Sequence, residues 1–390
     1  MNEKQTDAAR SWESLRKGHQ SRPLEWLVER GIFLVSLSAI VMIFLIFAFV
    51  GREAWPVVTG KMNSSSVQTV IPVAEMDKHS PAELRAYLGL TKAKFDSMDL
   101  ETRKLMMEIK VEADKEKPVD KDAPVNTTSW HYLFWPHAWT GYEKPSYIWQ
   151  PVSLIHKYNL VPLIIGSLKA TLVALLFSVP LALAAAIYVS QLAPAWAKEW
   201  LKPAIELLAG IPSVVLGFFA LIVMATVLQK VFGYESRLNA FVAGIALGLA
   251  IIPVVFSIAE DALTSVPRSY TQAALALGSS RWQAAWKIVL PTAIPGVFAA
   301  VVLGFGRAIG ETMIVLMASG NASIVSGSFF DSTRTMTATI AAELAETVTG
   351  GHHYRILFLI GALLFIVTFA ANFAGDMVMH RLKRKLEGKA

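Results

Sequence analysis

Residues 272–291 read Q-A-A-L-A-L-G-S-S-R-W-Q-A-A-W-K-I-V-L-P and lie between two long apolar runs, 238–259 and 294–318. The segment combines small residues with Gly278, which tolerates a positive φ and therefore permits a sharp turn. Pro291 suits the start of the next helix, where a missing N–H costs no hydrogen bond. Taken alone, these features predict a short amphipathic connector between two membrane spans.

The composition predicts an integral membrane protein. Hydrophobic residues make up 54% of the 390 residues, and a soluble globular domain is rarely that apolar. A helix needs roughly 20 mostly apolar residues to cross the hydrocarbon layer. Six segments qualify and predict an all-α membrane protein: 31–50, 161–190, 204–229, 238–259, 294–318 and 354–379. The chain has no cysteine, which excludes disulfides, iron–sulfur clusters and thiolate chemistry.

The distribution of Lys and Arg predicts the topology. Six of them precede the first apolar run and five follow the last one, whereas residues 51–160 carry 14 basic and 14 acidic side chains. Since Lys and Arg collect in cytoplasmic loops, both termini are expected in the cytoplasm. This bias accounts for the formal net charge of +6, so membrane lipid rather than nucleic acid is the expected partner of this basic chain.

These patterns divide the chain into five parts. Residues 1–30 are expected to form a cytoplasmic tail, and 31–50 an uncleaved first span, because no small-residue cleavage site follows it. Residues 51–160 are too long for an ordinary loop and are expected to form a periplasmic insertion. Helices two to six occupy 161–379, and 380–390 form a second cytoplasmic tail.

The insertion after the first span contains three kinds of sequence. Residues 80–117 are predicted to be helical, because the sequence S-P-A-E at their start combines an N-cap, an early proline and an acid three residues after the cap. Residues 118–126 are typical of a linker. Residues 130–149 contain eight Trp, Tyr and Phe, which fit an aromatic belt at the lipid headgroups. A stacking platform for sugars or nucleic-acid bases is the alternative.

A further helix is expected in the outer loop 319–353, where apolar residues recur every four positions from Met336 to Val348. Four residues near the end of this loop could be metal ligands: Glu343, Glu346, His352 and His353. Adjacent histidines in a surface loop are more often only solvated, so no metal site is expected.

Two charges lie inside the fifth apolar run, in the stretch G-R-A-I-G-E-T-M at 306–313. Arg307 is expected about 20 Å into the span at 1.5 Å per residue, a depth at which an arginine costs at least about 2.5–3.5 kcal/mol. Glu311 lies one helical turn further on the same face, within reach of an ion pair. A structural ion pair is one interpretation. The other is a translocation pathway, because guanidinium binds tetrahedral oxyanions through paired donors.

The segment 272–291 resembles the E-A-A-x3-G-x9-I-x-L-P loop of ABC-importer permeases. The resemblance implies a cytoplasmic helix that docks into an ATPase subunit. The matching positions are Gln272, Ala273, Ala274, Gly278, Ile288, Leu290 and Pro291. The family usually has Glu at the first of these positions, and the Gln in this chain puts a salt bridge to the ATPase in doubt.

Three further stretches resemble the phosphate-specific ABC-importer permeases, in particular the first permease of the pair: 209–219, 306–313 and 335–343. The resemblance covers about 150–380 and also fits 31–50. It implies a six-helix permease that works with a sister permease, two ATP-binding subunits and a periplasmic phosphate-binding protein in the bacterial inner membrane. Arg307 and Glu311 match the charged pair of that family. Residues 60–126 lie outside the pattern.

The expected function is therefore the import of inorganic phosphate, with no covalent chemistry in this chain. The chain lacks a G-x4-G-K-[ST] loop, so ATP and Mg²⁺ are expected in the partner ATPase and no cofactor is expected here. The alternatives are a permease for phosphonate, molybdate or sulfate, a channel or secondary carrier, and a membrane-embedded enzyme.

Overall fold

The structure is a computed structural model, and the residues that it describes include six helices that are long and apolar enough to cross a membrane. These helices are Trp26–Val58, Val161–Leu192, Ser213–Phe232, Ala240–Thr264, Arg281–Gly310 and His352–Arg381. The expected all-α membrane fold is confirmed. Contacts divide the chain into two compact units, Met1–Arg52 and Glu53–Ala390. The structure describes residues 23–60, 62, 84, 88, 95, 98–115, 128–139, 142–153 and 156–386.

The first unit contains most of α2 (Pro23–Val58). This helix is apolar on all sides, as expected of a helix that meets lipid. It begins eight residues before the predicted start at residue 31. The remainder of the predicted tail, residues 1–22, lies outside the described residues.

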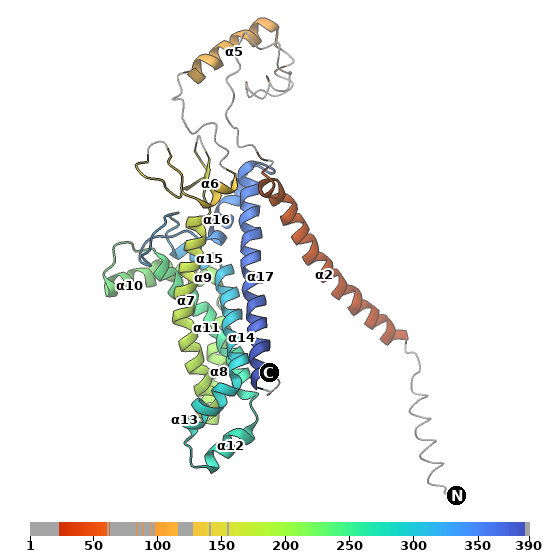
Figure 1. Ribbon diagram of the computed structural model, residues 1–390, viewed down its shortest axis with the longest axis vertical. Helices are drawn as coiled ribbons and strands as arrows, with labels where there is room; N and C mark the ends of the chain where they lie inside the picture. Colours follow the sequence, from red (N-terminus) through yellow and green to blue (C-terminus); the bar gives the residue numbers. More distant parts are fainter. Residues whose placement is uncertain are drawn as a thin grey trace. The chain divides into compact units, whose positions relative to one another are not determined.

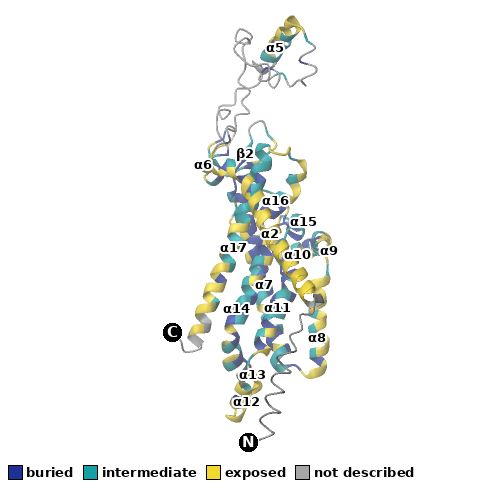
Figure 2. Cartoon of the chain, turned by 90° about the vertical axis from the view of Figure 1, so that its right-hand side faces the viewer, coloured by how far each residue is buried: buried dark blue, intermediate teal, exposed yellow. Residues whose placement is uncertain are grey.

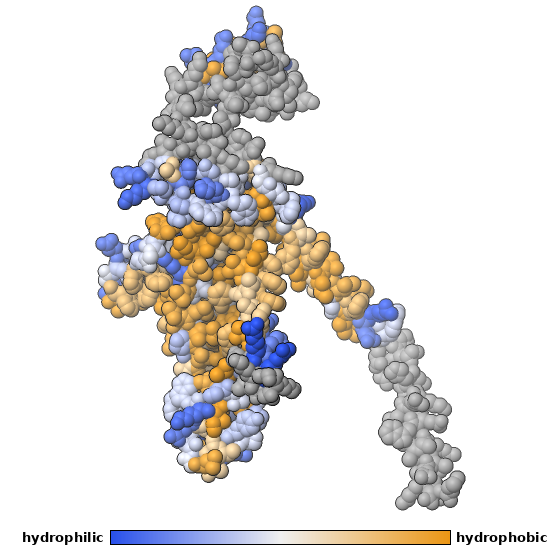
Figure 3. All heavy atoms as spheres, in the orientation of Figure 1, coloured by the Kyte–Doolittle hydropathy of each residue, from blue (hydrophilic) through white to orange (hydrophobic). Residues whose placement is uncertain are grey.

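The second unit is built on a bundle of four long helices, shown in Figure 1. Its members are α7 (Val161–Ile187), α11 (Ala240–Thr264), α14 (Leu290–Gly310) and α17 (His352–Leu386), and the π-helical turn η2 (Tyr188–Leu192) extends α7. α11 packs against α7 and α14, and α14 packs against α17. Gly244 permits close packing, because a Cβ there would lie 2.5 Å from that of Val173. Figure 3 shows hydrophobic residues around the middle of the bundle and more hydrophilic residues at its ends.

The predicted third span, 204–229, is wrong in its boundaries, because the chain breaks within it. α8 (Ala195–Leu207) and the 3-10 turn η3 (Leu208–Gly210) end at Ile211, which has an extended backbone. Proline disfavours the helical conformation of the residue before it, so Pro212 explains the break. The span consists of α9 (Ser213–Phe219), the π-helical turn η4 (Ala220–Met224) and α10 (Ala225–Phe232).

The predicted fifth span, 294–318, is also divided. The chain runs through α12 (Arg268–Ala276), α13 (Arg281–Ala284) and η5 (Ala285–Val289) into α14, which ends at Gly310. α15 (Met313–Ala318) is a separate helix, because Glu311 has an extended backbone with φ −69° and ψ 136°. α12 and α13 lie at one end of the bundle, opposite the end that carries α6 and α16 (Figure 1).

At that opposite end, the chain forms a small folded cap. The cap contains α6 (Trp130–Phe134), the antiparallel strands β1 (Trp149–Gln150) and β2 (Lys157–Tyr158), α16 (Met336–Glu343) and η6 (Leu344–Glu346). The predicted helix in the loop 319–353 is confirmed by α16. The predicted aromatic belt is wrong for Trp139 and Trp149, each only 4% exposed, because they pack against other aromatic rings of the cap.

The predicted helix over 80–117 is observed in part, as α5 (Leu100–Lys115). A bend at Met98 and Asp99 interrupts the expected single helix. The Asp99 carboxylate accepts a hydrogen bond from the backbone N–H of Thr102 (3.3 Å), which gives α5 its own N-terminal cap. Most of residues 80–97 and all of the expected linker 118–126 lie outside the described residues.

Candidate functional site

The chain between α11 and α14 contains two short helices joined by a tight turn. We call residues 268–289 the connecting segment. Gly278 has φ 84°, which confirms the predicted sharp turn. The backbone N–H of Ser279 donates to the Ala274 carbonyl (3.1 Å), and that of Gly278 donates to the Leu275 carbonyl (3.0 Å). These bonds satisfy carbonyl groups at the end of α12, as left-handed glycine caps do.

The second helix of the connecting segment begins with a capping box. The Ser280 hydroxyl accepts from the backbone N–H of Gln283 (3.2 Å), and the Gln283 side chain accepts from the N–H of Ser280 (2.9 Å). The pattern S-x-x-Q at 280–283 is the signal by which the sequence could have predicted this helix start. Hydrogen bonds thus fix the backbone on both sides of the turn, at the end of α12 and at the start of α13.

The connecting segment has a buried side and an exposed side. Ala274, Ala284 and Ala285 are buried, while Leu277 is 89% exposed. The exposed side chains also include Trp282 and Trp286, whose rings meet edge to face at 5.8 Å. Among the other predicted docking positions, Gln272, Ala273 and Pro291 are exposed, and Ile288 and Leu290 are half-buried. Exposed large apolar side chains at the polar end of a bundle are typical of a surface that binds another protein.

Arg307 lies in the last turn of α14, where the helix carbonyls favour a positive charge. The expected place near the middle of the span 294–318 is wrong, because α14 begins earlier and ends at Gly310. The side chain is exposed in the single chain and forms no hydrogen bond or ion pair with any residue that the structure describes. An unpaired guanidinium is costly in lipid. This face of α14 therefore suits contact with protein or water.

The expected ion pair between Arg307 and Glu311 does not form. Glu311 follows the end of α14, so it does not occupy the next turn of the same helix. Its carboxylate instead accepts from the backbone N–H of Met313 at the start of α15 (3.1 Å). Its carbonyl accepts from the hydroxyl of Thr337 in α16 (2.8 Å). Glu311 therefore holds the break between two helices, and α16 supports that break.

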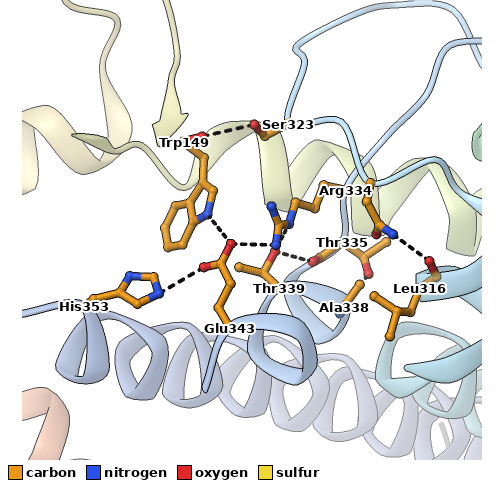
Figure 4. A network of polar contacts seen from close by, with 10 residues as sticks. Trp149, Leu316, Ser323, Arg334, Thr335, Ala338, Thr339, Glu343 and His353 are labelled. Carbon is orange, nitrogen blue, oxygen red and sulfur yellow. Dashed lines mark hydrogen bonds and ion pairs between the residues drawn. The ribbon is translucent and has the colours of Figure 1, made fainter. Parts of the chain in front are cut away.

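Glu343 is the centre of a polar network in the cap, which Figure 4 shows. One carboxylate oxygen accepts from the Arg334 guanidinium (2.5 Å) and from the Trp149 indole (3.1 Å). The other lies 3.1 Å from Nε2 of His353. Burial, with the nearby Glu343 carboxylate, raises the pKa of Tyr158, so its hydroxyl stays neutral. Glu343 thus joins α16 to the loop before it, to α17 and to β1.

The network places two of the considered metal ligands, Glu343 and His353, in contact at 3.1 Å. In the described part of the chain, no group of three or more His, Asp or Glu is arranged to hold a metal ion. The sequence patterns singled out Glu343 and Trp149 for different reasons, but they did not connect these two residues, which lie 194 positions apart along the chain. No local signal connects residues so far apart.

A family model described as "Binding-protein-dependent transport system inner membrane component" matches residues 178–388. Similar curated proteins include the probable ABC transporter permease protein YqgH of Bacillus subtilis. It is 38% identical over 222 residues, which cover 57% of this chain and 72% of that protein. The family model's match spans more than half of the chain and includes the connecting segment, Arg307 and Glu311.

Two further relatives are named as phosphate transport system permease proteins PstC. The one from Xylella fastidiosa (strain 9a5c) is 34% identical over 61% of this chain and 78% of its own length. The one from Pasteurella multocida is 32% identical over 62% of this chain and 80% of its own length. Among solved structures, the inward-facing MetNI methionine ABC transporter matches with a TM-score of 0.46 and 19% identity, over 57% of this chain and 95% of that chain.

Proposed function

Because the chain belongs to the family of binding-protein-dependent transport system inner membrane components, we propose that it is the permease subunit of an importer of inorganic phosphate. The observation that carries the choice of substrate is the similarity to the phosphate permeases of Xylella and Pasteurella, which extends over 78% and 80% of their lengths. As a member of this family, the chain is a multi-pass membrane protein and a transport subunit rather than an enzyme.

We propose that the exposed side of the connecting segment is the docking site for the ATPase. The support is structural: Leu277, Trp282 and Trp286 present apolar surface that the chain itself does not cover. The turn between its two helices is capped at Gly278 and Ser280, which favours one defined conformation of this surface. ATP and Mg²⁺ would be bound by that ATPase, and this chain would need no cofactor. We also propose that both termini lie in the cytoplasm, as the Lys and Arg near the chain ends suggest by the positive-inside rule.

In the same proposal, Arg307 is the anion-handling group of the pathway. Its guanidinium has no partner among the described residues, so its donors are available to an oxyanion. Glu311 positions the helix break beside it rather than neutralising it. The exposed face of α14 would meet the sister permease, and a periplasmic phosphate-binding protein would deliver the substrate at the outer end.

The test is uptake of radioactive phosphate by vesicles that contain this chain with its partner permease, ATPase and binding protein. The proposal predicts uptake that requires ATP and is competed by unlabelled phosphate. Preferential competition by sulfate, molybdate or phosphonate would assign another oxyanion. Uptake without ATP and without the ATPase would assign a channel or a secondary carrier.

A further inference from the structure

The end of the bundle that carries the connecting segment contains an ion pair between two helices. Its residues, Lys202 and Glu260, lie 58 positions apart along the chain. Nζ of Lys202 in α8 lies 2.7 Å from Oε2 of Glu260 in α11. Glu260 is only 7% exposed, and its other oxygen accepts from the Thr264 hydroxyl (3.0 Å). The exposed Asp261 lies further from Lys202, at 3.8 Å. Glu260 is therefore a buried carboxylate with two donors, only one of which comes from outside its own helix.

α8 has little other attachment to the bundle. Throughout α8, which the structure describes in full, Ala197 is the only buried residue. Trp196 and Trp200 are 70% and 75% exposed, and Figure 2 shows α8 as a mostly exposed helix. Because so few apolar side chains hold α8, its polar contacts carry much of its attachment. Hydrogen bonding to Glu260 also raises the pKa of Lys202, which keeps the ammonium charged.

Two more hydrogen bonds complete what we call the inner joint, made of Ser190, Gln191, Lys198, Lys202, Glu260 and Leu263. Nζ of Lys198 donates to the Ser190 carbonyl (2.9 Å), and the Gln191 amide donates to the Leu263 carbonyl (3.3 Å). The joint thus binds α8, η2 and the end of α11 together. α13 contacts η2, and only residues 265–267 separate α11 from α12. The connecting segment is attached to this joint at both of its helices.

We propose that the ion pair between Lys202 and Glu260 transmits movement of the connecting segment to α8, and through it to the third span. This inference rests on the proposed function as an ATP-driven permease. α8 leads directly into α9 through the break at Pro212, so a displacement of α8 moves the start of that span. Lys202 and Glu260 are positioning residues in this scheme, and neither contacts the transported anion. Without the pair, ATP hydrolysis continues but moves the third span less.

The first test measures ATP hydrolysis and phosphate uptake by the reconstituted complex. Lys202→Met keeps the length of the side chain and removes its charge, and we expect phosphate taken up per ATP to fall about tenfold, within the usual range of coupling between sites. Lys202→Arg retains an ion pair and should keep most of the coupling. Glu199→Gln is the control on the same helix, since Glu199 is exposed and lies outside the inner joint. Equal uptake per ATP in Lys202→Met and Lys202→Arg would overturn the proposal.

A second test does not depend on the transported substrate. Because the chain has no cysteine, spin labels can be placed at Glu199→Cys and Lys287→Cys, both exposed positions. In the complex with the ATPase, the distance between the labels should stay narrowly distributed with and without ATP. Lys202→Met should broaden that distribution, and Lys202→Arg should not. A distance distribution that is equally narrow in Lys202→Met contradicts the proposed role of the ion pair between Lys202 and Glu260. Failure of phosphate uptake in the unmodified complex contradicts only the proposed function.

Discussion

Arg307 shows how the end of a helix changes the role of a single residue. Within one continuous helix, Arg307 and Glu311 would share a face and pair. Since α14 ends at Gly310, the two side chains acquire different tasks, and the carboxylate caps α15 instead. The guanidinium is left on an exposed face of the single chain, available to a ligand or to a neighbouring subunit.

Arg307→Lys should lower phosphate uptake about tenfold or more, a loss of about 1.4 kcal/mol of stabilisation, because lysine lacks the planar fork. Arg307→Ala should abolish uptake but leave the protein folded, since no described residue depends on this side chain. Arg237→Lys is the control, as that exposed guanidinium reaches only the Thr226 hydroxyl. Uptake at matched protein levels is the measurement, and normal uptake by Arg307→Lys would refute the anion role.

Glu311 should stabilise the folded protein through the hydrogen bond that its carboxylate accepts from the Met313 N–H. Glu311→Ala should lower the free energy of unfolding by about 1 kcal/mol, as loss of a helix cap does. Glu311→Gln keeps a carbonyl oxygen in the same place and should cost less. Thermal unfolding in detergent compares the two variants. Equal destabilisation by Ala and Gln would mean that the charge, rather than the cap, stabilises the break.

Among the elements, the connecting segment has a turn that is limited by the backbone conformation of Gly278 rather than by steric crowding around it. No atom lies within 4 Å of where a Cβ on Gly278 would be, yet φ is 84°. A substitution there meets no steric obstacle but must adopt the left-handed conformation, which costs most residues about 1–2 kcal/mol. The turn, and with it the angle between α12 and α13, is therefore sensitive to residue type.

Gly278→Ala should weaken binding of the ATPase and lower ATP-driven uptake, because alanine disfavours the left-handed turn. Gly278→Asn should be tolerated better, since asparagine adopts that conformation more readily. Co-purification of the ATPase and phosphate uptake are the two measurements. The explanation fails if alanine and asparagine at this position behave alike.

The attachment of α16 to its neighbours depends on Glu343. Glu343→Leu leaves the Arg334 guanidinium without its carboxylate and should cost about 3 kcal/mol of stability. Adding Arg334→Met removes the unpaired charge and should restore much of that loss. Glu346→Leu is the matched control, because Glu346 is exposed. Thermal unfolding of the unmodified protein and the three variants is the measurement. The explanation is contradicted if the double variant is no more stable than Glu343→Leu.

For the molecule as a whole, the insertion between Met62 and Thr128 should be separable from the transport machinery. The family match begins only at residue 178. Met62 belongs to the buried core of the cap, and the Thr128 hydroxyl donates to the Met62 carbonyl (3.2 Å). The two ends of the intervening chain therefore meet, and a short bridge can replace what lies between them.

Replacing residues 63–126 by a short Gly/Ser bridge should preserve membrane insertion and leave phosphate uptake measurable, because the cap core stays intact. Membrane fractionation and uptake assays are the measurements. A deletion variant that inserts stably but transports nothing would place the insertion in the transport mechanism.

The sequence by itself determined the class of fold, the number of spans and the turn at Gly278. These features depend on local properties, namely the length of apolar runs and the φ range of one residue. The breaks after Gly210 and Gly310 had local causes too, but long apolar runs concealed them. Pro212 accounts for the first break, whereas the second is also held by Thr337, which is distant in sequence.

Only the tertiary structure decided which polar side chains meet. Trp149 and Glu343 are brought together by the packing of the cap, and Lys202 and Glu260 by the packing of α8 on α11. Such contacts depend on the positions of whole helices, which no short sequence motif determines. The sequence therefore identified the parts of the permease, and the packing of its helices established how those parts are joined.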